Sequence, residues 1–175
     1  MLKFEQVILK HQKLIYNLAQ RIMGNPEDAQ DVAQEVAIKI YRNLAKCKGE
    51  EFLAAWISKI THNACMDALR RRKGRLHESL DEMLEIGDGE AAKQVPDPDA
   101  GPELLLLQKE LSAQIEAALN QLPLSHRLPV ILRDIHGRTY DEMAEILDLP
   151  AGTVKSRLFR GRAKLKAILL EQNLN

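Results

Sequence analysis

Hydrophobic residues recur at three- and four-residue steps through most of the chain, which is the period of amphipathic helices. A first stripe of this kind runs from Leu2 to Met23 and stops at Gly24, a residue suited to the left-handed end of a helix. Asn25 then stands where the cap of a second helix belongs, and a third helix is expected from Phe52 to Gly74. Alternating runs typical of strands are absent, so the pattern predicts an all-α fold.

The C-terminal half shows the same period and predicts four helices, the last two forming a helix-turn-helix. The first two cover 103–122 and 125–135. Thr139 and Glu142 have the spacing of a capping box at the start of the third helix. Pro150 lacks an amide and ends that helix, so a fourth begins directly after it. The helix over 103–122 carries a stripe of Leu104, Leu107, Leu111, Ile115, Ala118 and Leu119.

The last helix has one apolar face and one basic face. Its predicted buried stripe consists of Val154, Leu158, Gly161 and Leu165, and the opposite face offers candidate DNA contacts at Lys155, Ser156, Phe159 and Arg160. Between Gly152 and Lys166 there are six basic residues and no acidic one, which suits a groove lined by phosphates. The alternative is a solvated cationic helix, but such a helix usually interleaves Glu with Lys and does not expose Phe159 among its charges.

The second helix has an outer face of mixed character, made by Asp31, Gln34, Glu35 and Ile38. An apolar residue at position 38, on the side away from the inner stripe, suggests a binding partner. A solvated face with one stray hydrophobic residue explains the same pattern equally well. The face alone therefore decides nothing.

The third helix combines an aromatic residue, a lysine and amides at Trp56, Lys59 and Asn63, and it ends in the cations Arg70, Arg71 and Arg72. This mixture suits single-stranded nucleic acid, whose bases stack on aromatic rings and whose phosphates pair with cations. The alternatives are a tryptophan anchored in the core and cations that complement the helix dipole.

Charge is distributed unevenly although the 175-residue chain is neutral overall. Residues 1–74 carry 13 basic and 8 acidic side chains, residues 75–103 carry 2 and 9, and residues 104–175 carry 10 and 8. The acidic middle is rich in Gly and Pro and cannot bury enough apolar surface to fold alone. We therefore expect two small helical domains, 1–74 and 104–175, joined by a flexible acidic linker over 75–103.

Several functional classes are disfavoured by what the sequence lacks. It has no signal peptide and no apolar run of about 18 residues, which predicts a cytoplasmic protein with Cys47 and Cys65 reduced. No Cys-x-x-Cys pair suggests a metal site, and no phosphate-binding, dinucleotide-binding or hydrolase motif suggests an enzyme. We expect neither a cofactor nor a small-molecule substrate.

Three segments together resemble the extracytoplasmic-function (ECF) sigma factors of the sigma-70 family: DAQDVAQEVAIKIYRNL at 28–44, KGEEFLAAWISKITHNACMDALRRRK at 48–73, and LPLSHRLPVILRDIHGRTYDEMAEILDLPAGTVKSRLFRGRAKL at 122–165. The resemblance covers nearly the whole chain. It implies a transcription initiation factor that binds core RNA polymerase and acts on double-stranded and melted promoter DNA. Many members are held by an anti-sigma factor, often a membrane-bound one.

The resemblance also assigns roles by position. It implies that the minus-thirty-five element is contacted by Arg133, Lys155, Ser156, Phe159 and Arg160. It implies that the minus-ten element is contacted by Lys48, Phe52, Trp56, Lys59, Asn63, Arg70, Arg71 and Arg72. Core polymerase binding falls on Asp31, Gln34, Glu35 and Ile38. Two positions depart from the family pattern. Pro150 stands where a Ser or similar cap is frequent, so the last helix is expected to start without a side-chain cap. Asp148 replaces a frequent Gly, and Asp adopts the left-handed conformation less easily than Gly.

Two other classes of protein could carry a basic helix-turn-helix of this kind. A stand-alone helix-turn-helix regulator would bind its operator without polymerase and would usually dimerise, yet the sequence shows no coiled-coil seam. A protein-interaction adaptor is disfavoured by the acid-free last helix and Phe159.

Overall fold

The computed structural model describes residues 3–74 and 102–173, and every regular element in these two ranges is helical. The N-terminal half holds α1 (Phe4–Met23), α2 (Pro26–Asn43), the short turns η1 (Leu44–Lys46) and η2 (Glu50–Phe52), and α3 (Leu53–Gly74). The C-terminal half holds α4 (Pro102–Asn120), α5 (Leu124–Val130), the π-helical turn η4 (Ile131–Ile135), α6 (Tyr140–Leu147) and α7 (Ala151–Asn173). The all-α prediction is confirmed.

The predicted acidic linker lies outside the described residues except at its end. At that end, α4 begins at Pro102.

Helix ends follow the signals in the sequence. Gly24 ends α1 in the left-handed conformation, with φ of 80°, and its amide donates to the Gln20 carbonyl at 2.9 Å. The Asn25 side chain accepts a hydrogen bond from the Asp28 amide at 2.8 Å, and Pro26 is the first residue of α2. Both predicted ends are confirmed, and they set the antiparallel turn between α1 and α2.

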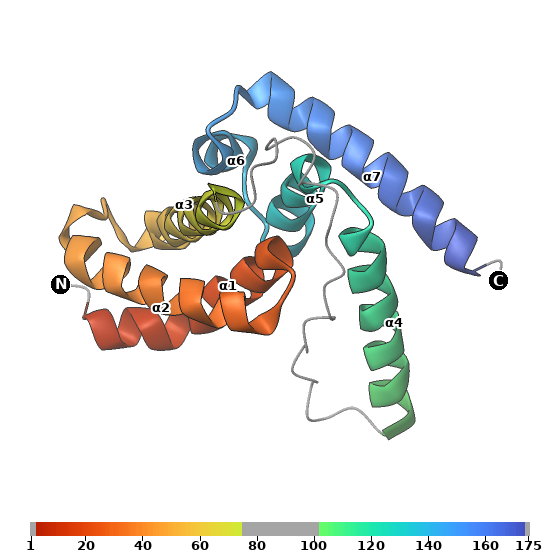
Figure 1. Ribbon diagram of the computed structural model, residues 1–175, viewed down its shortest axis with the longest axis horizontal. Coiled ribbons are helices and arrows are strands. Elements are labelled where there is room, and N and C mark those ends of the chain that lie inside the picture. Colours follow the sequence, from red (N-terminus) through yellow and green to blue (C-terminus); the bar gives the residue numbers. More distant parts are fainter. Residues whose placement is uncertain (1–2, 75–101, 174–175) are drawn as a thin grey trace.

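The helices pack so that the two halves of the chain touch (Figure 1). In the N-terminal half α1 lies against α2 and α3, and in the C-terminal half α5 lies against α7. Helix α6 packs on α3 and joins the halves. One hydrophobic cluster contains buried residues from both sides, among them Leu18, Val36 and Ile57 from the first half and Leu128 and Met143 from the second. The halves therefore share a core.

Helix α4 departs from the expected stripe. Figure 1 shows α4 and α7 diverging, and Leu107 and Leu111 in the first part of α4 are exposed. Ala118 and Leu119, near its end, are buried, and Leu119 belongs to a smaller cluster with Leu158 of α7. Periodicity correctly predicted the helix and its buried end, but an inward position for Leu107 and Leu111 is wrong because the described neighbours of α4 pack near its other end.

Three buried polar side chains connect the two halves in the interior of the molecule. Arg21 of α1 forms an ion pair with Glu116 of α4, and both side chains are 4% exposed. Arg127 of α5 donates to the Arg21 carbonyl at 3.2 Å and to the Leu122 carbonyl at 2.9 Å.

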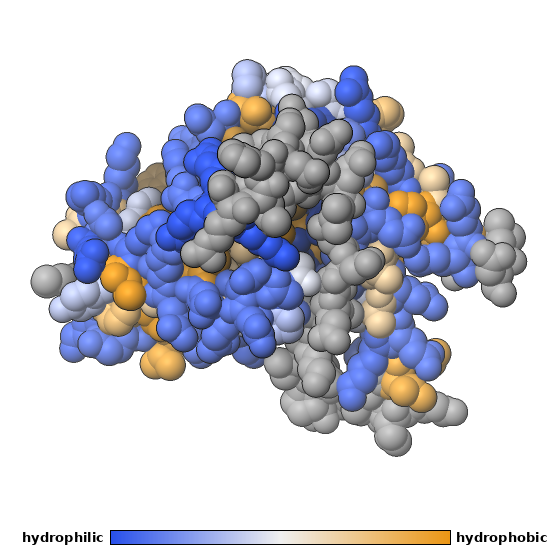
Figure 2. All heavy atoms as spheres, viewed as in Figure 1, coloured by the Kyte–Doolittle hydropathy of each residue, from blue (hydrophilic) through white to orange (hydrophobic). Residues whose placement is uncertain are grey.

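Figure 2 shows that the outer surface seen in this view is largely hydrophilic, with hydrophobic residues in separate patches.

Candidate nucleic-acid interface

Helices α6 and α7 form the helix-turn-helix that the sequence predicts. The Thr139 hydroxyl accepts from the Glu142 amide at 3.2 Å, and the Glu142 carboxylate accepts from the Thr139 amide at 2.7 Å. This is the predicted capping box. Asp148 ends α6 with φ of 53°, a left-handed conformation that Asp adopts more readily than most residues. Helix α7 starts at Ala151, directly after Pro150.

The two faces of α7 are those expected from its sequence. Val154, Leu158 and Gly161 are buried, whereas Leu165 is only half-buried. The opposite face exposes Lys155, Ser156, Phe159 and Arg160, and Phe159 is 76% exposed. The Ser156 hydroxyl donates to the Thr153 carbonyl at 2.9 Å, which leaves its oxygen lone pairs available to an outside donor.

Tyr140, which the sequence reasoning did not single out, lies between two of the candidate DNA contacts. The guanidinium carbon of Arg133 is 5.1 Å from the centre of its ring, and Nζ of Lys155 is 5.2 Å from the same point. Arg133 also donates to the Arg138 carbonyl at 2.8 Å. The tyrosine therefore brings together one cation from η4 and one from α7. An aromatic residue at the first position of a helix, shortly after the cations Arg133 and Arg138, is the signal that could have found it.

The candidate minus-ten residues in the loop and first turns of α3 are mostly open to solvent. Lys48, Lys59 and Asn63 are exposed, and Phe52 in η2 is 54% exposed. Trp56 is half-buried against the shared core, so it satisfies part of each interpretation that the sequence allowed.

The middle of α3 is more enclosed than the mixture of polar residues suggested. Thr61 is buried and its hydroxyl donates to the Ile57 carbonyl at 2.9 Å, so it is not a surface residue. His62 is hydrogen-bonded to the Asn63 side chain at 3.3 Å, and burial lowers the pKa of His62. His62 is therefore expected to be neutral near pH 7.

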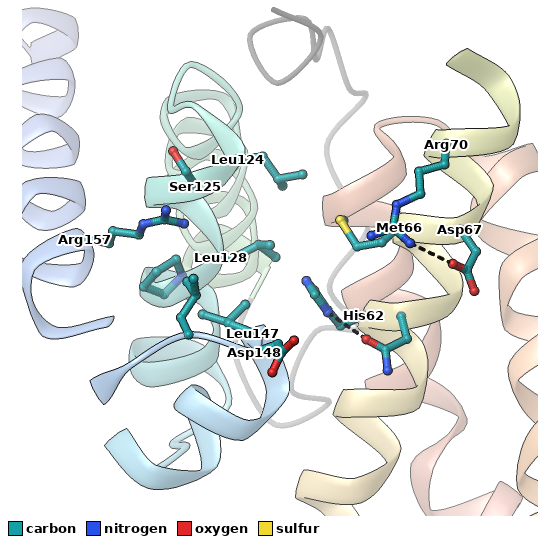
Figure 3. Close-up of a pocket in the computed structure, with 13 residues that line it drawn as sticks. His62, Met66, Asp67, Arg70, Leu124, Ser125, Leu128, Leu147, Asp148 and Arg157 are labelled. Carbon is teal, nitrogen blue, oxygen red and sulfur yellow. Dashed lines mark hydrogen bonds and ion pairs between the residues drawn. The ribbon is translucent and has the colours of Figure 1, made fainter. Parts of the chain in front are cut away.

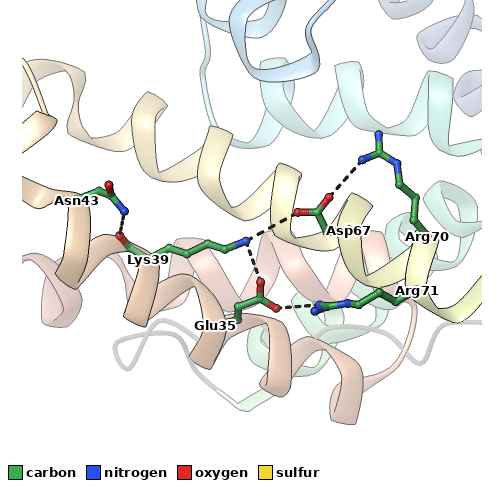
Figure 4. A network of polar contacts seen from close by, with 6 residues as sticks. All are labelled: Glu35, Lys39, Asn43, Asp67, Arg70 and Arg71. Carbon is green, nitrogen blue, oxygen red and sulfur yellow. Dashed lines mark hydrogen bonds and ion pairs between the residues drawn. The ribbon is translucent and has the colours of Figure 1, made fainter.

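The three arginines at the end of α3 are each paired with an acidic residue. Arg70 contacts Asp67 at 3.2 Å and Arg72 contacts Asp28 at 3.4 Å. Arg71 contacts Glu35 at 2.9 Å, and Glu35 also contacts Lys39 at 2.8 Å (Figure 4). The hydrogen bond from Lys39, followed by that from Arg71, lowers the pKa of Glu35. Each of these arginines is thus paired with a carboxylate from α2 or α3.

The outer face of α2 is open over most of its predicted length. Asp31 and Gln34 are exposed and Ile38 is 52% exposed, whereas Glu35 is half-buried in its ion pairs. Tyr41 continues this face with an exposure of 68%, and its ring contacts Phe4 of α1 edge-on at 5.2 Å. The sequence reasoning included Ile38 but missed Tyr41, which lies three residues further along the same helix.

A cleft of about 570 Å³ lies between part of α3 and the helices α5, α6 and α7 (Figure 3). Its walls include Asn63 and Arg70 from α3, Leu124 and Leu128 from α5, and Arg157 from α7. Two candidate minus-ten residues therefore face the helix-turn-helix side of the molecule.

Among the described residues no three His, Cys, Asp or Glu side chains are grouped as a metal would require. Cys65 is buried, and burial raises the pKa of its thiol to about 12, which leaves it unreactive. None of the helices that the structure describes combines the length and apolar character needed to cross a bilayer.

Comparison with known families agrees with this geometry. Residues 7–75 match the family model for sigma-70 region 2, and residues 112–165 match the model for sigma-70 region 4. Helices α2 and α3 lie within the first match, and α5 to the middle of α7 lie within the second.

Two curated relatives align with nearly the whole chain. The ECF RNA polymerase sigma factor SigE of Mycolicibacterium smegmatis is 34% identical over 171 residues, which is 97% of this chain and 63% of the relative. The RNA polymerase sigma-H factor of Pseudomonas aeruginosa is 33% identical over 169 residues, covering 95% of this chain and 86% of the relative.

A solved structure has the same fold. The sigma factor RpoE from Bartonella quintana, in complex with the anti-sigma factor NepR, superposes with a TM-score of 0.72 at 23% identity. The superposition covers 95% of this chain and 96% of that one.

Proposed function

Because this chain belongs to the ECF sigma factors of the sigma-70 family, which direct RNA polymerase to promoters, we propose how its two halves divide that task. The exposed face of α7 reads the minus-thirty-five element. Helix α2 binds core polymerase, and α3 with its preceding loop holds the opened minus-ten element. We place this activity in the cytoplasm, and the chain itself performs no covalent chemistry.

The observation that carries the proposal is the composition of the exposed face of α7. A helix that buries Val154 and Leu158 while presenting Lys155, Phe159 and Arg160 has the geometry of a major-groove reader. Arg133 lies beside this face through Tyr140, where it is suited to a backbone phosphate that fixes the register of the helix on DNA.

Core polymerase is proposed to bind the open face of α2. Asp31 and Gln34 offer polar contacts, and Ile38 and Tyr41 offer exposed apolar surface on the same side. A face that combines an exposed aromatic residue, an aliphatic residue and acidic residues is typical of a protein interface with a central apolar contact and a polar rim.

The opened minus-ten strand is proposed to run along α3. Lys48 and Phe52 supply a loop pocket for a flipped base, and Trp56, Lys59 and Asn63 continue the path. Arg70, Arg71 and Arg72 finish it once phosphates replace Asp67, Glu35 and Asp28 as their partners. Exposed ion pairs contribute only about 0 to 1 kcal/mol each, so exchanging them for phosphates costs little.

The two halves are proposed to separate on the promoter. Elements about twenty base pairs apart lie on the order of 70 Å apart along B-DNA. A compact chain of 175 residues is about 40 Å across, too small to reach both elements. Parting of the halves would also open the cleft beside Asn63 and Arg70 and make room for a strand of DNA along α3.

Regulation by an anti-sigma factor is proposed as well. The Bartonella quintana relative was solved in complex with one, and its chain follows this fold over 95% of the residues. Such a partner would keep the chain from core polymerase.

The experiment is run-off transcription by core RNA polymerase, with and without the chain, over a library of genomic promoter fragments. We expect transcripts only when both are present, and aligned start sites should give two elements at fixed spacing. A stand-alone regulator would instead shift the same fragments without polymerase and yield no new transcripts, which would overturn the proposal.

A further inference from the structure

Two candidate DNA contacts that are far apart in sequence converge on one aromatic ring. Arg133 of η4 and Lys155 of α7 lie 5.1 and 5.2 Å from the centre of the Tyr140 ring. Cations within about 6 Å of a tyrosine ring are attracted by its electron-rich face. The ring is therefore a physical link between the phosphate-contacting and base-reading parts of the proposed site.

The ring itself is held firmly. Tyr140 is the first residue of α6, and the reciprocal hydrogen bonds between Thr139 and Glu142 fix the backbone on either side of it. Its side chain is half-buried and packs against both hydrophobic clusters of the molecule. A ring fixed by backbone and core can in turn restrict the flexible side chains that rest on it.

The two cations gain most from such restriction. Lysine and arginine lose a large amount of rotamer freedom when they are ordered on a ligand. A side chain that the free protein already holds near its bound position has lost part of this conformational entropy before binding. Less entropy is then lost on binding, so the affinity for DNA is higher. One terminal nitrogen of Arg133 donates to the Arg138 carbonyl, and the contact with the ring uses no hydrogen bond. The other guanidinium N–H groups therefore stay available to donate to DNA.

We propose that Tyr140 is a positioning residue for minus-thirty-five recognition, whose ring holds Arg133 and Lys155 in the arrangement in which they meet DNA. Tyr140 and Lys155 line a shallow pocket together with Ser156, Phe159 and Arg160, so the ring lies next to the other candidate DNA contacts of α7. This inference rests on the proposed function and adds a residue to it. Two other roles compete with it: a purely structural ring, and a hydroxyl that contacts DNA directly.

The test uses holoenzyme reconstituted from the full chain and core RNA polymerase. Its affinity is measured for a promoter recovered by the run-off experiment and for the same fragment with the minus-thirty-five element replaced. Tyr140→Leu should weaken binding of the intact promoter about three- to tenfold and leave the replaced promoter unaffected. Tyr140→Phe, which retains the ring, should restore affinity to within about twofold of the wild type.

A second pair of variants separates positioning from structure. In a background of Arg133→Gln and Lys155→Gln, Tyr140→Leu should add less than about twofold, because the groups it positions are gone. An undiminished effect in that background would mean that the ring acts through the fold, and equal losses for Tyr140→Phe and Tyr140→Leu would assign the role to the hydroxyl. Either result overturns the proposal, as does wild-type affinity of Tyr140→Leu.

Should Tyr140→Leu fail to fold, phenylalanine analogues with increasing numbers of ring fluorines at position 140 provide the measurement. Fluorine removes the electron density that attracts cations while nearly preserving ring shape, so affinity should fall stepwise with each fluorine. A flat series would overturn the proposal. Failure of the wild-type holoenzyme to distinguish the two promoters would instead count against the proposed function.

Discussion

Arg21 and Glu116 lie 95 residues apart in the sequence, yet each is the buried charge partner of the other. The Arg21 Nε donates to both carboxylate oxygens of Glu116, at 3.1 and 3.2 Å. Two charges removed from water in this way depend on each other, since either one alone would be strongly unfavourable in the interior. The pair therefore ties α1 of the first half to α4 of the second.

Removing one member of this pair should loosen the contact between the halves. Glu116→Gln leaves Arg21 without a counter-charge, which typically costs about 3 to 5 kcal/mol at a buried site. We expect a larger radius of gyration in small-angle scattering and faster amide exchange in α5. Glu110→Gln, an exposed position on the same helix, is the matched control and should change neither.

Lys155→Ala and Arg160→Ala should weaken use of promoters that depend on the minus-thirty-five element, because both side chains lie on the exposed face of α7. Each should cost about 1 to 3 kcal/mol if it reads a base edge. Transcription from promoters with and without that element gives the measurement, with Lys109→Ala on α4 as a cation control. Reduced affinity for core polymerase with unchanged promoter choice would contradict this placement.

Charge reversal at both Asp31 and Glu35 should abolish co-purification with core polymerase while the helical circular dichroism signal is retained. The two residues lie on the open side of α2, and Glu35 pairs only with exposed or half-exposed cations. Glu145→Lys on α6 controls for the added positive charge and should still co-purify. An unchanged pull-down by the double variant would remove this face from the polymerase interface.

Mild acid should destabilise the protein through His136. Burial, followed by the charges of Arg21 and Arg138, lowers the pKa of His136 to about 4 from its ordinary 6.5. The folded state then binds fewer protons than the unfolded one, so stability is full above pH 6.5 and falls as pH decreases toward 4.

His136 contributes up to about 3 kcal/mol to this fall. Burial also lowers the pKa values of His11, His62 and His126, so they act in the same direction. Urea unfolding at pH 7.5 and pH 5 should show the loss, and His136→Asn should reduce it. An equal loss in that variant would assign the pH dependence to other groups.

Two glycines of α7 should respond in opposite ways to alanine. A Cβ at Gly161 would lie 2.7 Å from the His126 carbonyl oxygen and 2.9 Å from Val130 Cγ2, so Gly161→Ala should destabilise by about 1 to 3 kcal/mol. At Gly152 a Cβ meets nothing within 4 Å, and Gly152→Ala should be neutral or slightly stabilising. Thermal unfolding of the two variants compares them directly. Equal melting temperatures would show that α5 and α7 can move apart at this contact without loss of stability, which would contradict the prediction.

Local signals predicted the elements of this fold well. The Asn25 cap, the Thr139 capping box and the break at Pro150 each arise from bonds or steric limits within a few residues of one another. Helical period likewise predicted which side of α7 is buried and which side carries Phe159. Such features follow from neighbours in sequence, and so they can be read there.

Contacts between helices could not be read in the same way. The helical period indicates that Arg71 and Glu35 lie on the outer sides of α3 and α2. It does not indicate that the two side chains contact each other between these helices. The placement of Tyr140 beside Lys155 depends on the turn between α6 and α7 and on the packing of η4. The exposure of Leu107 depends on where α4 ends relative to α7. Each of these is set by tertiary packing, which no single segment encodes.

The core shared by the two halves also bears on how tightly this protein can hold its polymerase. If only the parted form can bind, the apparent dissociation constant equals the intrinsic one divided by the fraction of molecules already parted. Buried side chains such as Leu128 and Met143 make that fraction small, because parting exposes them to water. A substitution that weakens the contact between the two halves would thus tighten polymerase binding, although it changes no residue of this chain that contacts the polymerase.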